Sequence, residues 1–170
     1  MRDTAKVFAR LVEFESRAAA LYLGFAHRFT DNKDLSWFWL AMSMEERQHA
    51  QFLEFCGAER LLAAGLPEDS EVQALAELLS NLEERAGKEK LSADDAFLIA
   101  AELEGSEIND VFAGVVQPVV GTLHLMRKKI EVLIPNHMQT LIEGARQLGA
   151  SAQTLARMAA VKRREPPSTG

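Results

Sequence analysis

Five side chains of this chain have the types and spacing of metal ligands, and they fall where apolar periodicity predicts a dry interior. They are Glu15, Glu46, His49, Glu104 and His137. At about 100° per residue, each shares a helix face with large apolar residues. An uncompensated carboxylate in such a place costs several kcal/mol of desolvation or stays protonated. Carboxylates can bridge divalent cations and imidazoles can fill terminal positions, so metal binding would compensate these groups.

The spacing of these residues predicts that they meet. Glu46 and His49 are three positions apart, so one helix face presents both. Residues whose numbers are symmetric about a hairpin turn lie at equal height, which puts Glu15 level with Glu46 and His49, and Glu104 level with His137. The separations from Glu15 to His49 and from Glu104 to His137 are 34 and 33 positions, which indicates an internal duplication. In four-helix bundles, this inward pattern holds two iron or manganese ions.

The elements that must position these residues are helices. The chain is rich in Ala, Leu, Glu, Arg and Met with apolar residues three and four positions apart, and no stretch alternates with period two. We therefore predict an all-α fold. The expected helices cover about residues 4–29, 34–64, 69–87, 92–116 and 122–148, with a last short helix from 151 to about 164. Pro135 is expected to kink the fifth of these helices.

Composition excludes or disfavours several classes of protein. The 170 residues suit one compact unit, which we expect at 1–150, followed by a short helix and frayed tail at 151–170. The net charge of −6 and the lack of a basic block disfavour nucleic acid as a partner. Cys56 is the only cysteine, so disulfide frameworks and four-cysteine iron sites are excluded. The N-terminus lacks an apolar leader and no apolar run is long enough to span a membrane, so we expect a cytoplasmic protein.

On these residues the chain resembles the ferritin-like superfamily, and within it the rubrerythrin-like branch. The resemblance covers about residues 4–148. It is carried by Glu15 with Tyr22, Glu46-Arg47-Gln48-His49, Glu104 with Glu107, and His137. It implies an antiparallel four-helix bundle with a crossover helix between bundle helices 2 and 3, followed by the short C-terminal helix.

The resemblance also implies roles for the site residues. Glu15 and His49 would be terminal ligands of one ion, and Glu46 would bridge two ions. Glu104 and His137 would bind the second ion. Tyr22 would be a hydrogen-bond partner of a ligand or a phenol that quenches radicals. Two iron ions are expected, with one ion or manganese as the alternatives.

One position departs from the family pattern. The family has a second bridging glutamate three residues before the last histidine, where this chain has Ile134 followed by Pro135. The site then holds two ions weakly, holds one ion well, or uses a replacement. Glu107 is the favoured replacement, because related proteins often carry a second carboxylate on that helix. Glu131 contributes only if the kink at Pro135 swings it inward.

Three functions remain open at this stage. The first is an oxidoreductase acting on peroxide, O₂ or Fe(II), which as a peroxidase needs a separate electron donor because the chain has no Cys-rich donor domain. The second is iron binding for storage. The third is a degenerate bundle that serves as an interaction module. The aromatic run Trp37-Phe38-Trp39 covers more than one helix face, so we also expect a homodimer.

Overall fold

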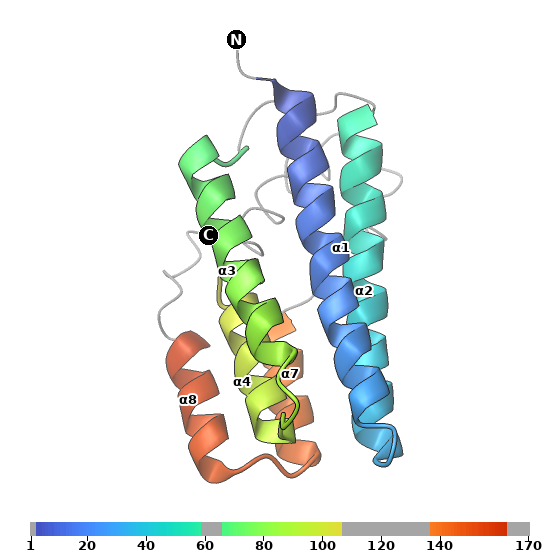
Figure 1. Ribbon diagram of the computed structural model, residues 1–170, viewed down its shortest axis with the longest axis vertical. Helices are drawn as coiled ribbons and strands as arrows, with labels where there is room; N and C mark the ends of the chain where they lie inside the picture. The colour runs from blue at the N-terminus through green and yellow to red at the C-terminus, as the bar shows by residue number, and fades with distance from the viewer. Residues whose placement is uncertain (1–2, 59–65, 107–136, 163–170) are drawn as a thin grey trace.

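The computed structural model describes residues 3–58, 66–106 and 137–162. These residues form six α-helices and, within those ranges, no β-strand, so the prediction of an all-α chain is confirmed (Figure 1). The helices are α1 (Thr4–Arg28), α2 (Lys33–Ala58), α3 (Asp69–Ala86), α4 (Ala93–Glu104), α7 (His137–Gln147) and α8 (Ala152–Lys162).

Polar side chains cap the N-terminal ends of the helices, close to the predicted helix starts. Asp3 caps α1 by accepting from the Lys6 amide, and Asn32 accepts from the Leu35 amide at the start of α2. At the start of α4, Ser92 and Asp95 each accept a hydrogen bond from the other's backbone amide. This is a capping box with Asp in the last place, at the predicted start of the helix. Local sequence signals therefore set these helix starts.

Consecutive described helices alternate in direction (Figure 1). α1 and α2 form an antiparallel pair along most of their length, and α3 returns along α1 from the end where α2 finishes. α4 then packs against α3, α7 and α8, so it lies at the centre of a second group made of α4, α7 and α8. This group and the first, made of α1, α2 and α3, share one core.

Aromatic rings join the helix groups in that core. The fully buried Trp39 ring of α2 packs against Tyr22 and Phe25 of α1 at centroid distances of 5.7 and 5.1 Å. It also lies 5.0 Å from Phe97 of α4. Phe38 lies edge-on to Trp39 at 5.0 Å. These rings bury large apolar areas where α1, α2 and α4 meet, and this burial stabilises the packing of the three helices.

The predicted helix over 92–116 is wrong at its C-terminal end, because α4 stops at Glu104. The Gly105 amide closes the last turn by donating to the Ala101 carbonyl. A side chain at Gly105 would lie 2.2 Å from Val161 of α8, so only glycine lets the two segments approach this closely. A contact with a residue far along the chain therefore coincides with this helix end.

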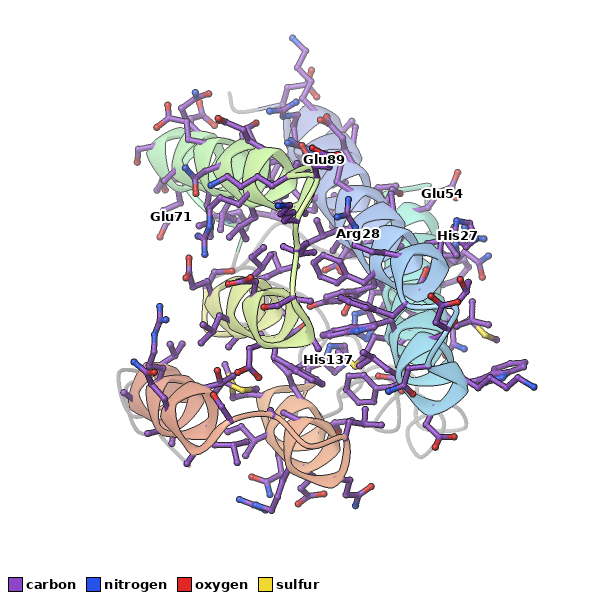
Figure 2. All side chains as sticks on the ribbon, turned by 60° about the horizontal axis from the view of Figure 1, so that its bottom comes forward. His27, Arg28, Glu54, Glu71, Glu89 and His137 are labelled. Atoms are coloured by element: carbon purple, nitrogen blue, oxygen red, sulfur yellow. The ribbon has the colours of Figure 1, made fainter. Side chains whose placement is uncertain are left out.

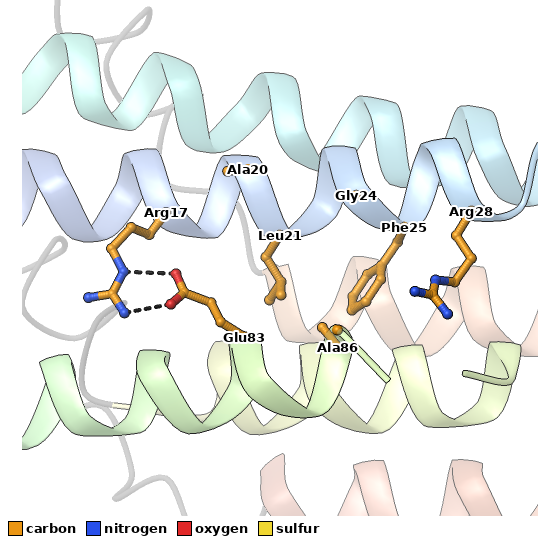
Figure 3. A pocket seen from close by; sticks show the side chains of 9 residues that line it. Arg17, Ala20, Leu21, Gly24, Phe25, Arg28, Glu83 and Ala86 are labelled. Atoms are coloured by element: carbon orange, nitrogen blue, oxygen red, sulfur yellow. Dashed lines mark hydrogen bonds and ion pairs between the residues drawn. The ribbon is translucent and has the colours of Figure 1, made fainter. Parts of the chain in front are cut away.

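Two arginines of α1 hold α3 in place. Arg17 forms a bidentate ion pair with Glu83, with both nitrogen to oxygen distances at 2.8 Å (Figure 3). Arg28 donates to the backbone carbonyls of Lys88 and Glu89 just after α3. Between the two arginines, Leu21 and Phe25 line a shallow groove. Polar anchors at both ends thus align α3 with α1.

None of the helices in the described ranges is both long enough and apolar enough to cross a membrane. Several predicted features lie outside the described residues. They are the continuation of the second helix to 64, the stretch 107–136 with the kink at Pro135, and the tail 163–170.

Candidate metal centre

Five ionisable side chains converge in the interior between α1, α2, α4 and α7. We call Glu15, Glu46, His49, Glu104 and His137 the Glu–His cluster; each is no more than 4% exposed. Figure 2 shows His137 in the space between α4, α7 and α2. Four helices therefore deliver potential ligands to one buried place, as helical periodicity predicted.

The carboxylate of Glu46 lies at the middle of the cluster, between the two imidazoles. Its Oε2 is 3.2 Å from Nδ1 of His49, and its Oε1 is 3.0 Å from Nδ1 of His137. The two imidazole rings are nearly parallel, with centroids 4.9 Å apart. Glu15 Oε2 approaches His49 Nδ1 at 3.6 Å from the α1 side. Glu46 thus has one oxygen toward each half of the cluster.

Glu104 contacts the half of the cluster that contains His137. Its Oε2 is 3.3 Å from Nδ1 of His137, and its Oε1 accepts a hydrogen bond from the Tyr22 hydroxyl. Tyr22 is fully buried and stacks on Trp39, so its hydroxyl is held in position by the aromatic core. The family resemblance implied that Tyr22 lies next to a ligand. In the structure, its hydroxyl lies next to the candidate ligand Glu104.

Glu45 is the residue that sequence reasoning missed. At about 100° per residue it lies near the edge of the apolar face of α2, yet its Oε2 is 3.5 Å from Nε2 of His137. That oxygen is buried and has no hydrogen-bond partner among the described residues, although the rest of the side chain is half-buried. The only sequence signal was its position immediately before Glu46.

Protonation of the cluster reflects burial and close contacts. Burial raises the pKa of Glu15 to about 8, because the neutral acid is better tolerated in the interior. Burial also opposes ionisation of Glu46, but contacts with His137 and His49 outweigh it and hold the pKa of Glu46 below its usual range. Burial lowers the pKa of His49 and His137, yet the neighbouring carboxylates raise them to about 9 and about 11.

The donor set fits a divalent cation. Glu46, His49 and His137 each offer one ligand atom, and these atoms lie within 4.8 Å of one another. Neither ring nitrogen of His137 has a well-directed hydrogen bond, and Oε2 of Glu15 is also buried without one among the described residues. Buried polar atoms are normally satisfied, so atoms without a partner in such a place are a mark of a missing ligand. This buried cluster can therefore hold a metal ion.

The charge balance points the same way. Four carboxylates, those of Glu15, Glu46, Glu104 and Glu45, surround two imidazoles. Within the described ranges, no lysine or arginine forms an ion pair with Glu15, Glu45 or Glu46. In the apo protein, protons on Glu15 and on the two imidazoles offset much of this charge, as their raised pKa values show. A divalent cation that displaced those protons would balance the carboxylates instead.

The second predicted carboxylate on the third bundle helix, Glu107, lies outside the described residues, as do Ile134, Pro135 and Glu131. How the missing bridging glutamate is replaced therefore stays a prediction.

The fold and the cluster define an all-helical chain with a buried Glu–His site for a cation. No family model matches this chain, and no curated protein or solved structure shows significant similarity to it.

Proposed function

We propose that this chain is a non-haem iron protein of the ferritin-like type, an oxidoreductase acting on peroxide, O₂ or Fe(II). The observation that carries the proposal is the Glu46 carboxylate between two imidazoles, 3.2 Å from His49 and 3.0 Å from His137. A carboxylate with one oxygen toward each of two nitrogen ligands has the arrangement of a bridge between two ions. Glu15 would complete one half of the site and Glu104 the other.

The arrangement of the helices supports the same class. α1 and α2 supply Glu15, Glu46 and His49, while α4 and α7 supply Glu104 and His137. α3 lies between the two pairs in chain order and packs against α1 and α4, as a crossover helix of a four-helix bundle would (Figure 1). In this proposal α1, α2, α4 and α7 belong to the four bundle helices, and α8 is the added C-terminal helix.

Each residue of the cluster has a task in this proposal. Bound iron would supply electrons to an oxidant or accept them from a reductant. Glu46, His49 and His137 would hold the metal, and Glu15 and Glu104 would neutralise its charge. Tyr22 would fix the orientation of Glu104 through its hydrogen bond. Since His49 and His137 hold protons in the apo protein, metal binding would release protons to solvent.

The deciding experiment is metal content per chain after anaerobic Fe(II) loading and desalting, followed by spectroscopic detection of iron oxidation on adding peroxide or O₂. We expect two equivalents, or one if the second position lacks its bridge. The Glu46→Gln variant should lose most of the metal. The matched control is Glu77→Gln, an exposed glutamate of α3, which should retain it.

Thermal unfolding gives a second readout. Excess metal that binds only the folded state at 100 times its Kd should stabilise the wild type by about 2.7 kcal/mol and leave Glu46→Gln nearly unchanged. If wild type and Glu46→Gln contain no metal and melt alike with and without it, the cluster is a structural polar core. The chain would then be the interaction module considered above. Metal that binds but does not react would leave iron storage as the function.

A further inference from the structure

The outward face of α2 carries an exposed seam with coiled-coil spacing. Six positions separated alternately by four and three residues are all exposed and uncharged, and we call them the outer seam. They are Trp37, Ala41, Met44, Gln48, Gln51 and Phe55. Among them are the three large apolar side chains that stand out as exposed, Trp37, Met44 and Phe55, at 68, 56 and 49%. A 4-3 alternation is the repeat of helices that pack against another helix.

The seam lies on the opposite side of α2 from the Glu–His cluster. Glu46 and His49 point inward, whereas Met44 is about 200° away from Glu46 around the helix. The core residues Trp39 and Leu53 follow the inward face. The outer seam is therefore a second apolar face of α2 that the described residues leave uncovered. It spans about 27 Å, enough for five turns of a partner helix.

We propose that the outer seam is a dimer interface, in which α2 packs antiparallel against α2 of a second copy about a two-fold axis between Gln48 and Gln51. This proposal does not depend on metal at the Glu–His cluster. The register places Met44 opposite the partner's Phe55 and Gln48 opposite the partner's Gln51. Apolar contacts then lie on both sides of two central glutamine pairs, and polar residues at seam positions are known to specify register. A self-complementary face is what a two-fold dimer requires.

Charge complementarity supports the second copy and the antiparallel direction. Arg47 and Glu54 flank the seam on the same side, both exposed, and neither forms an ion pair with another described residue. In the antiparallel register Arg47 lies beside the partner's Glu54, and the two-fold axis makes the pair twice. A parallel arrangement would instead place Arg47 beside the partner's Phe52, with no charge to meet it.

Sedimentation of the full chain over micromolar concentrations tests the interface. We expect a dimer for the wild type, and a dissociation constant raised about tenfold or more by Met44→Glu, which buries a charge at the seam. The matched control is Ala156→Glu on the exposed side of α8, which should remain dimeric. A monomeric wild type would mean that the chain's own remaining residues or solvent cover the seam, and the proposal would be overturned.

Charge exchange tests the direction of packing. Arg47→Glu should weaken the dimer, because it sets a new carboxylate of each copy against the partner's Glu54, and adding Glu54→Arg should restore it. The two residues are seven apart on one helix, so they do not pair within a chain. If Arg47→Glu leaves the dissociation constant unchanged, the antiparallel register is wrong.

Disulfide crosslinking in a Cys56→Ala background tests the register. Met44→Cys mixed with Phe55→Cys should crosslink on mild oxidation with diamide, because these positions face each other. Either variant alone should not, because like positions lie about 16 Å apart in this register. Circular dichroism confirms that each variant folds. Crosslinking of the single variants in place of the mixture would overturn the register.

Discussion

Tyr22 and Glu104 lie 82 positions apart in the chain, yet the phenol hydroxyl donates a buried hydrogen bond to Oε1 of the carboxylate. The contact joins α1 to α4 directly beside the Glu–His cluster. The Tyr22 ring also stacks on Trp39 at 5.7 Å, so the aromatic core and the candidate metal centre share this residue. Packing and ligand orientation are thus coupled through one side chain.

Replacing Tyr22 with phenylalanine separates these two contributions. Tyr22→Phe keeps the ring against Trp39 and removes the hydroxyl, so we expect the apo protein to lose about 1.5–3 kcal/mol of unfolding free energy, the range for hydrogen bonds to charged groups. Urea denaturation measures it. An unchanged midpoint would show that the hydrogen bond to Glu104 contributes nothing net.

Gly144 and Gly24 should respond oppositely to alanine. A Cβ at Gly144 would lie 2.2 Å from Cε2 of the Phe38 ring, and overpacking of this kind costs about 1–3 kcal/mol. Nothing lies within 4 Å of a Cβ at Gly24, which is helical and lies near the C-terminal end of α1. There alanine should stabilise by about 0.5–1 kcal/mol through helix propensity. Thermal melts of both variants compare them, and equal shifts would contradict the packing argument.

The ion pair between Arg17 and Glu83 should make a small, salt-sensitive contribution. The two side chains are 23 and 39% exposed, so solvent screens the pair and Glu83→Gln should cost only about 0.2–1 kcal/mol. The loss should shrink as NaCl is raised, because exposed charges are screened. The measurement is urea denaturation at low and high salt. A loss that does not change with salt would indicate that packing of the Glu83 stem matters more than its charge.

Cys56 should make stability fall at alkaline pH. Burial raises the pKa of its thiol from 9.0 to about 11. A raised folded pKa means that the thiol's contribution is fully present below about pH 9 and is lost as pH rises towards 11, since the unfolded chain releases its proton first. The unfolding free energy measured over this window should fall less steeply for Cys56→Ala. Parallel pH profiles would contradict this assignment.

Helix starts and helix faces were predictable because they depend on neighbouring residues. Ser92 and Asp95 form a capping box at the predicted start of α4, and the inward face of α2 carries Glu46 and His49 as its periodicity indicated. Burial of Glu15, Glu104 and His137 followed from the same rule applied to other helices.

Tertiary packing determined the features that the periodicity of a single helix cannot indicate. The end of α4 at Gly105 coincides with the approach of Val161, and Glu45 reaches His137 only because α7 packs beside α2. Similarly, periodicity places Trp37 and Trp39 on different faces of α2, but only packing decided that Trp37 stays exposed. Periodicity reports the angle of a side chain around its own helix. Distances between helices depend on how side chains far apart in the sequence fit together.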